Sequence, residues 1–373
     1  MKKILFIVNV DWFFSSHRLP IALEAKKQGY EIHLACGLTD KRVELEKLGI
    51  VVHSLDLKRG NSSIYCEFKL LKQLFFIFKL IKPDLVHLIT IKPILMGGIL
   101  AKILKIPAVV ISFSGLGLIL KNKIFNKIIS FFLYVALSNK NQKIIFQNNN
   151  DRSYISKIRS GIYETSEIIK GSGVDLSIFS HSKKENEDCT NLIVMMASRL
   201  LYSKGVNEFI KAAKIINKVN KKIRFVLVGD VDPENPDSIK KNELLRWKSE
   251  NFVEIWGYKK DMREIFKKCD IFVFPSYYGE GLPKVLIEAA ACGCAIITTD
   301  HPGCRDAVEP SSAILIPVRD HLALVNSILN LVKNPQKIKK MAISGRRLAE
   351  REFDLNKVVD RHIGIYKKLF SNI

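Results

Sequence analysis

Two glutamates, Glu280 and Glu288, stand eight residues apart in a stretch that changes from loop to helix. Glu280 is flanked by glycines, whereas Glu288 falls in an apolar-periodic segment that predicts a helix beginning near Leu282, with Pro283 in its first turn. The N–H groups of Gly281 and Leu282 would then point out of a helix N-terminus, where anions bind. Two acids beside an anion site suit a diphosphate that carries hydroxyls, such as a nucleotide sugar. The alternative is two solvated surface acids.

A second group of candidate residues follows the end of a predicted strand. Arg199 and Lys204 are spaced to bracket a bound diphosphate, and Gly205 allows the backbone to turn between them and the next helix. Arginine offers phosphate oxygens a planar fork and lysine offers a point charge. In so basic a chain the alternative is a pair of surface cations.

The composition limits the class of protein. The 373 residues are enough for two domains, and a hydrophobic fraction of 47% excludes a disordered chain. The net charge of +22 favours an anionic partner, either nucleic acid or an anionic membrane. Seven cysteines without framework spacing fit a reducing compartment. The start of the chain predicts a buried strand rather than a signal sequence, and we find no stretch of the ~18 apolar residues that spans a bilayer.

Short apolar runs alternate with helical patterns, which predicts α/β architecture with parallel sheets covered on both faces. The expected strands are Lys3–Val8, Glu31–Cys36, Val51–Leu55, Leu85–Leu88, Ala108–Ser112, Lys143–Phe146, Glu167–Ile169, Leu192–Ala197, Phe225–Val228, Phe252–Ile255, Ile271–Phe274, Ala295–Thr298 and Ala313–Ile316. The expected helices include Arg18–Gln28, Ile94–Leu104, Val206–Ile216, Asp261–Lys267 and Leu282–Ala291.

The run Gly171–Asp175 and the polar residues after it interrupt this alternation and indicate an interdomain linker. We therefore expect an N-terminal domain over 1–174, a linker over 175–190 and a C-terminal domain over 191–354. A final helix over 355–373 is a candidate for packing back on the first domain. Two doubly wound Rossmann-like domains would face each other across a crevice at the carboxyl ends of their strands.

These motifs together resemble family 4 retaining glycosyltransferases of the GT-B architecture. The resemblance rests on the Ser-Arg-Leu…Lys-Gly segment at 198–205, Val228-Gly-Asp230, Trp256-Gly257 and the Glu280–Glu288 pair, in the family's order. The run Trp12–Ala22, with Ser112-Phe-Ser-Gly115-Leu-Gly117, is similar to a bacterial subgroup that builds polysaccharides on undecaprenyl diphosphate.

The resemblance implies roles for individual residues. Arg199 and Lys204 would neutralise the donor diphosphate, which is the leaving group. Glu288 would hold the ribose hydroxyls and Glu280 the hydroxyls of the donor sugar, with the Gly281 and Leu282 amides beside the phosphates. The resemblance places uracil at the loop of Gly257 and Tyr258, although Tyr258 equally fits a plain loop aromatic. It implies that neither a metal nor a cofactor is required.

The chain departs from the common family pattern at two places. Asn9-Val-Asp11 stands where many relatives carry a glycine pair, and Phe113-Ser-Gly115 stands where many carry a histidine. His17, expected in a crevice-facing loop at a helix start, is the substitute candidate for bonding hydroxyls or moving a proton. The alternative for His17 is a capping or packing role, and we expect His87 to be a satisfied core residue.

Other motifs give weaker signals. Gly115-x-Gly117 lacks the third glycine of a dinucleotide fingerprint, which argues against an NAD enzyme, and the resemblance makes Gly115 a donor-binding candidate. Cys292, Cys294 and Cys304 could suggest a metal site, for which only His301 has the spacing of a fourth ligand. Cys292 to Cys294 lie at a helix-to-strand turn, where buried small residues are expected, so we predict no structural metal.

Two segments, Lys58–Lys82 and Ile119–Ile145, carry much of the basic charge of the first domain. In both, lysines are interleaved with large apolar residues, which is typical of helices that bind an anionic membrane surface. The alternative is that the apolar faces are core and the lysines are their solvated backs. Nucleic acid is not favoured, because no recognised binding motif is present.

The leading interpretation is a peripheral enzyme of the cytoplasmic face of a bacterial inner membrane. It would transfer a sugar, expected to be an N-acetylhexosamine, from a UDP-sugar to a lipid-linked glycan acceptor on undecaprenyl diphosphate. A UDP-sugar epimerase with the same architecture and a non-enzymatic nucleic-acid-binding protein are the alternatives.

Overall fold

The computed structural model describes residues 1–57, 64–116, 123–180, 192–233 and 235–373. The chain divides into two compact units, the first made of Met1–Gly173 and Asn356–Ile373 and the second of Val174–Leu355. Residues 181–190 of the expected linker, and Gly117 of the glycine pair, lie outside the described residues. The described start of that linker belongs to the second unit, where Leu176 and Phe179 pack against the core.

The first unit contains a parallel sheet whose described strands run in the order β3-β2-β1-β4-β5-β6-β7. The strands are β1 Lys3–Val10, β2 Glu31–Gly37, β3 Val51–Ser54, β4 Leu85–Ile89, β5 Ala108–Ser112, β6 Gln142–Phe146 and β7 Ser166–Ile168. The helices are α1 Asp11–His17, α2 Leu19–Lys27, α3 Arg42–Lys47, α4 Ile64–Ile81, α5 Ile91–Ile103, α6 Lys123–Ala136, α7 Asn149–Ser156, α8 Ile162–Thr165 and α15 Leu355–Phe370.

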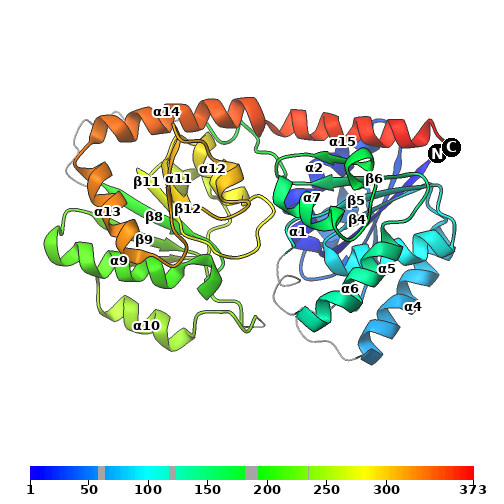
Figure 1. Ribbon diagram of the computed structural model, residues 1–373, viewed down its shortest axis with the longest axis horizontal. Helices are drawn as coiled ribbons and strands as arrows, with labels where there is room; N and C mark the ends of the chain where they lie inside the picture. Colours follow the sequence, from blue (N-terminus) through cyan, green and yellow to red (C-terminus); the bar gives the residue numbers. More distant parts are fainter. Residues whose placement is uncertain (58–63, 117–122, 181–191, 234) are drawn as a thin grey trace. The chain divides into compact units, whose positions relative to one another are not determined.

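Helices cover both faces of this sheet, as the continuous apolar strands require. Side chains alternate between the two faces along a strand. In β4, Val86 and Leu88 belong to the apolar cluster under α4, α5 and α6, whereas His87 points to the opposite face. Figure 1 shows α4, α5 and α6 side by side on one face of the sheet and α15 over the other.

The C-terminal helix α15 is part of the first unit. Its Tyr366 hydroxyl lies 2.7 Å from Nδ1 of His87, and the ring of Phe370 stacks on Tyr30 with centroids 5.0 Å apart. Nε2 of His87 lies 2.7 Å from the Ser112 hydroxyl. Both ring nitrogens of this buried histidine therefore have partners, and the expectation of a satisfied core residue is confirmed.

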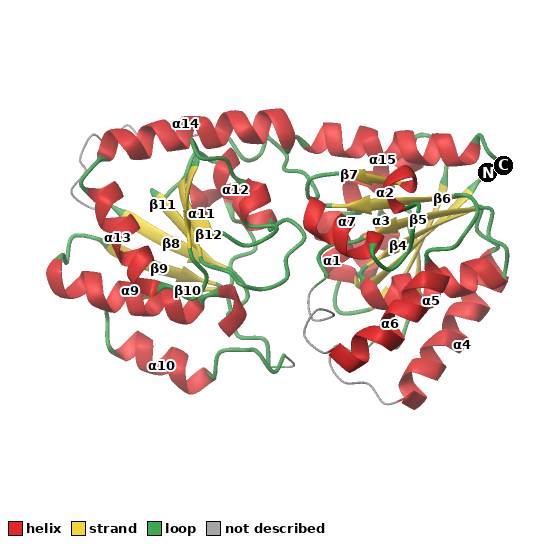
Figure 2. Cartoon of the chain, in the orientation of Figure 1, coloured by secondary structure: helices red, strands yellow, loops and turns green. Residues whose placement is uncertain are grey.

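The second unit contains a parallel sheet in the order β10-β9-β8-β11-β12-β13 among its described strands. The strands are β8 Ile193–Ala197, β9 Arg224–Val228, β10 Glu254–Gly257, β11 Ile271–Phe274, β12 Ala295–Thr299 and β13 Ala313–Ile316. The helices are α9 Val206–Val219, α10 Lys241–Ser249, α11 Arg263–Phe266, α12 Lys284–Ala291, α13 His321–Val332 and α14 Pro335–Glu352, with single 3₁₀ turns at Tyr202–Lys204 and Arg305–Ala307. Figure 2 shows the strands between helical layers.

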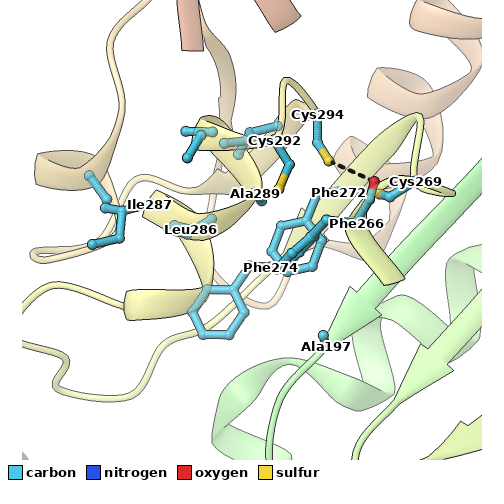
Figure 3. Packing of buried hydrophobic residues seen from close by; sticks show 14 of the residues in the cluster. Ala197, Phe266, Cys269, Phe272, Phe274, Leu286, Ile287, Ala289, Cys292 and Cys294 are labelled. Atoms are coloured by element: carbon cyan, nitrogen blue, oxygen red, sulfur yellow. Dashed lines mark hydrogen bonds between the residues drawn. The ribbon is translucent and has the colours of Figure 1, made fainter. Parts of the chain in front are cut away.

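The central strand β11 is apolar on both faces. Phe272 and Phe274 pack against α11, α12 and α14, and Ile271 and Val273 against α9 and α13. Figure 3 shows the first of these clusters, in which Cys294 lies beside Phe266.

The candidate metal cysteines belong to this core. Cys292, Cys294 and Cys304 are buried, and burial is the main cause that raises the pKa of the Cys292 and Cys304 thiols to about 12. They are therefore the small core residues that we expected. The described residues hold no cluster of three or more His, Cys, Asp or Glu side chains that could bind a metal.

The α/β fold of two doubly wound sheets is as predicted, and most strand bounds agree within two residues. Two local predictions are wrong. Asp11–His17 forms helix α1, so His17 ends a helix instead of standing in a loop. Helix α12 begins at Lys284 with Pro283 as its N-cap residue, because Pro283 has an extended backbone (ψ 116°), so Gly281 and Leu282 precede the helix.

Candidate active site

The strand order of the second unit places its site. The chain runs outward from β8 to β10 and then crosses to β11, so the order reverses between β8 and β11. Ligands of open α/β sheets bind at the carboxyl ends of strands at such a switch point. The loop after β8 carries Arg199 and Lys204, and the loop after β11 carries Glu280. The structure therefore brings three sequence-predicted residues to adjacent loops.

Gly205 allows the two loops to pack together. Its φ is +81°, and a Cβ atom at this position would overlap the carbonyl group of Pro275. A side chain is excluded both by the left-handed backbone and by this approach. Tyr277 N also donates a hydrogen bond to the Ser203 carbonyl at 2.9 Å. Lys204, which precedes Gly205, is consequently held against the β11 loop.

Lys204 and Glu280 form an ion pair between Nζ and Oε1. Their side chains are only 11% and 13% exposed, so the charges are largely shielded from water. The ammonium lies 5.5 Å from the ring centroid of Phe274 and 5.0 Å from that of Tyr278, and both are cation–π distances. The Ser276 hydroxyl donates to the same Glu280 oxygen at 3.3 Å. The lysine and the glutamate therefore lie side by side, and each has further contacts with the loop after β11 or with the strand itself.

Arg199 is oriented by an acid that the sequence analysis missed. Its Nη1 lies 2.8 Å from Oδ2 of Asp232, on the loop after β9. Burial and the Glu280 charge raise the pKa of the Tyr278 phenol, and Arg199 partly offsets the rise. The signal for Asp232 was its position, two residues beyond Val228-Gly-Asp230.

Glu288 lies on α12, one helical turn after Lys284, whose Nζ is 3.7 Å from its Oε1. Burial raises the pKa of the Glu288 carboxyl to about 6, and Lys284 partly offsets the rise. Because burial destabilises the ionised form of this carboxylate, hydrogen bonds from the hydroxyl groups of a ligand would stabilise it.

The loop before α12 is braced from the β12 side. Gly303 has φ +83°, and a Cβ there would lie 2.7 Å from the carbonyl oxygens of both Glu280 and Gly281. Residues larger than glycine at position 303 would therefore push against the backbone of Glu280 and Gly281. This contact restricts the backbone of the loop that carries the acid.

Gly257 is the last residue of β10, an edge strand that pairs with β9, and Tyr258 follows it. Gly257 has φ +65° and its carbonyl accepts a hydrogen bond from Gly229 N at 3.0 Å. Tyr258 is 72% exposed. The tyrosine is therefore accessible to a planar ligand, and its role as the seat of uracil stays a prediction.

The remaining predicted residues, His17 and Gly115, belong to the first unit. The His17 imidazole stacks on Phe13, one turn earlier in α1, with centroids 4.2 Å apart and planes 10° from parallel. Gly115 has φ +101° after β5.

Asp11, which the sequence analysis did not select, lies at the start of α1. Although burial raises the pKa of its carboxyl, hydrogen bonds from Thr39, Lys41 and Trp12 outweigh that effect and lower it. Asp11 thereby fixes the β1–α1 turn, and an acid directly after a buried strand was the available signal.

Comparison with known proteins identifies the class. A family model described as "Glycosyl transferase 4-like" matches residues 3–148, and one described as "Glycosyl transferases group 1" matches residues 177–348. The two models cover one unit each. The chain belongs to the family 4 glycosyltransferases of the GT-B fold, and it is an enzyme of sugar transfer.

Individual relatives agree with this assignment. The chain is 27% identical, over 100% of both chains, to the N,N'-diacetylbacillosaminyl-diphospho-undecaprenol alpha-1,3-N-acetylgalactosaminyltransferase of Campylobacter jejuni. It is 24% identical to the UDP-Gal:alpha-D-GlcNAc-diphosphoundecaprenol alpha-1,3-galactosyltransferase of Escherichia coli, over 84% of this chain and 82% of that one. The Anabaena protein HepE, solved with UDP, shares the fold, with a TM-score of 0.79, 19% identity and coverage of 99% and 100%.

Proposed function

We propose that this enzyme transfers an N-acetylhexosamine from a UDP-sugar to a glycan linked to undecaprenyl diphosphate, with retention of the anomeric configuration. The observation that carries the donor part is the Lys204–Glu280 pair, with Arg199 on the neighbouring loop, at the switch point of the second sheet. The acceptor part is supported by the names of two relatives, both of which act on diphospho-undecaprenol-linked sugars.

In this proposal the basic side chains stabilise the leaving group. As the bond from the sugar C1 to the β-phosphate oxygen breaks, negative charge grows on that oxygen, and Lys204 and Arg199 would balance it. The acceptor hydroxyl attacks C1 from the same face, and its proton passes to the departing phosphate oxygen. UDP leaves, and the new glycosidic bond keeps the original configuration. Protein cations thereby take the role that a divalent metal plays in other transferases.

Glu280 and Glu288 would bind rather than react. Glu288, with a pKa near 6, is ionised at neutral pH and can accept hydrogen bonds from the ribose hydroxyls. Glu280 would accept from the sugar hydroxyls. Positioning and charge stabilisation together account for large rate enhancements without an enzyme nucleophile.

The first unit offers a surface for the membrane that holds such an acceptor. Large apolar side chains are exposed on two helices that both pack against α5: Tyr65, Phe68, Phe76 and Leu80 on α4, and Ile128, Phe131, Phe132 and Tyr134 on α6. Lys72 lies between Phe68 and Phe76 at helical spacing, with its Nζ 6.0 Å from the Phe76 ring centroid. Among the described residues, no helix combines the length and apolar character needed to cross a bilayer. We infer peripheral binding to the cytoplasmic leaflet.

A basic hollow at the carboxyl ends of α4 and α5 fits the same partner. Lys79, Lys82 and Lys105 line a pocket of about 270 Å³ at the carboxyl ends of α4 and α5. Leu80 and Ile103, which neighbour the pocket residues in sequence, are exposed. Lysines next to exposed aliphatic side chains favour an anionic lipid surface.

The test is a transfer assay with the full chain. Purified protein is mixed with bacterial lipid extract containing undecaprenyl-diphosphate sugars and, separately, with labelled UDP-GalNAc, UDP-GlcNAc, UDP-galactose or UDP-glucose. Label entering the organic phase from one donor supports the proposal and identifies the sugar. Conversion of a free UDP-sugar into an isomer without lipid labelling would indicate an epimerase instead, and no turnover of any donor would contradict the proposed substrates.

A further inference from the structure

The two residues proposed to bind different parts of the donor form an ion pair with each other. Lys204, assigned to the diphosphate, forms its ion pair with Glu280, assigned to the sugar hydroxyls. Because both side chains are nearly buried, this pair is screened less than a surface pair. A donor therefore has to compete with the pair before it gains either contact.

The geometry indicates which partner gives way. The Lys204 ammonium is flanked by the rings of Phe274 and Tyr278 and precedes Gly205, which is packed on the Pro275 backbone. Glu280 is flanked by two glycines, and Gly303 packs against the backbone carbonyl oxygen of Glu280. Besides the ion pair, the Lys204 ammonium contacts these two rings, whereas the Glu280 carboxylate contacts the Ser276 hydroxyl at 3.3 Å. We therefore expect the Glu280 carboxylate to move and the lysine to stay in place.

The consequence depends on what the ligand carries. A diphosphate that takes over Lys204 leaves the Glu280 carboxylate close to phosphate oxygens of the same charge, in a site that water scarcely reaches. A sugar on the β-phosphate supplies hydroxyl donors that satisfy this carboxylate. A sugar-free diphosphate supplies none.

We propose that the Lys204–Glu280 ion pair makes Glu280 a specificity-determining residue, which favours the sugar-bearing nucleotide over the sugar-free nucleoside diphosphate. This inference rests on the proposed UDP-sugar donor site. It also gives the pair a part in turnover: once the sugar has left, Glu280 recaptures Lys204 and promotes release of UDP.

The experiment measures UDP affinity by calorimetric titration of the full chain at pH 8. Glu280→Gln removes the competing carboxylate and keeps its size, so UDP should bind on the order of tenfold more tightly, a change of about 1.4 kcal/mol. Glu254→Gln is the matched control, since Glu254 pairs with Arg224 at 2.7 Å at the start of β10. It should leave UDP affinity unchanged.

Substitution of Lys204 tests whether the increase in UDP affinity depends on the Lys204–Glu280 pair. Lys204→Met should weaken UDP binding, and adding Glu280→Gln to Lys204→Met should then bring no gain. If Glu280→Gln fails to fold, Glu280→Asp, whose carboxylate reaches less far, should show a smaller gain in the same direction.

Two outcomes would overturn the inference alone: wild type binds UDP and Glu280→Gln binds it no more tightly, or the gain persists without Lys204. Failure of wild type and all variants to bind UDP would instead contradict the proposed donor class, and the inference would fall with it.

Discussion

The two units differ in where they place polar and charged side chains. In the first unit, Arg18 and His87 are buried together with His362 and Tyr366 of α15. In the second unit, Lys204, Glu280 and Glu288 keep some exposure at the carboxyl end of the sheet. The second group is nearly buried but keeps contact with solvent.

The buried group of the first unit has an electrostatic cost that its packing must offset. Burial lowers the pKa of Arg18 to about 10 and that of His362 to about 3. The Arg18 guanidinium donates to the His17 carbonyl at 3.0 Å, and His87 joins Tyr366 to Ser112. The His87–Tyr366 contact attaches α15 to β4 of the first sheet. The comparison teaches that deep polar contacts here hold elements together, while those at strand ends are available for chemistry.

The largest expected effect is loss of catalysis at the second unit. Lys204→Met removes the cation that balances the leaving diphosphate and should lower the transfer rate by about 10²–10³-fold. The labelled-lipid assay measures the rate, and thermal unfolding checks that the fold is intact. Glu254→Gln should remain active. A fully active Lys204→Met enzyme would remove the distinction between the two units.

The converse change should affect stability and spare chemistry. Tyr366→Phe removes the hydroxyl that faces Nδ1 of His87 and leaves a buried polar atom without its partner, which costs about 1–3 kcal/mol. Denaturant unfolding should show the loss, while the transfer rate of the folded enzyme stays within about twofold of wild type. Unchanged stability would mean that this contact does not hold α15.

The pH dependence of donor binding tests Glu288. Its folded pKa, about 6, lies above the ordinary 4.5, so protonation on acidification begins near pH 6. Protonation removes an acceptor, and UDP-sugar affinity should fall up to about tenfold per pH unit below 6. The sugar nucleotide is the right probe because both its phosphates are diesters and remain ionised. The Glu288→Gln variant should bind the UDP-sugar weakly, and its affinity should not change slope near pH 6. If the slope still changes near pH 6 in this variant, another group is responsible for the titration.

The same shift has a signed effect on stability. Between about pH 4.5 and 6, the Glu288 carboxyl is protonated in the folded protein and ionised in the unfolded chain. The contribution of Glu288 to stability therefore declines as pH rises through this window. Unfolding free energies of wild type and Glu288→Gln should converge at low pH.

The smallest effect concerns the membrane surface of the first unit. Phe131→Ser removes a ring that is 64% exposed on α6 and should weaken binding to vesicles with anionic lipid by about fivefold. Leu245→Ser, at a residue 56% exposed in the second unit, is the control and should not change binding. If both variants lost vesicle affinity equally, the membrane-binding surface would not be specific to the first unit.

Much of the fold could be predicted because buried parallel strands are continuous apolar runs. The runs at Ala108–Ser112 and Ile271–Phe274 match the observed strands at both ends. Helix α1 escaped prediction because seven residues are too few for a helical period and its N-cap residue, Val10, makes no side-chain cap bond.

The site could be predicted only in part. Glu280 and Lys204 were visible because each lies in a motif with local signals. Their mutual pairing and the Arg199–Asp232 contact were not, because they join loops that follow different strands. Such contacts depend on the order of strands in the sheet, which a single sequence does not specify.

The central claim is that the donor binds where the order of the second sheet reverses. Hydrogen exchange of the full chain with and without UDP-sugar tests it most directly. The account predicts slower exchange in residues 198–205 and 276–288 when the nucleotide is present. Protection confined to other strand ends, with these two segments unchanged, would contradict it.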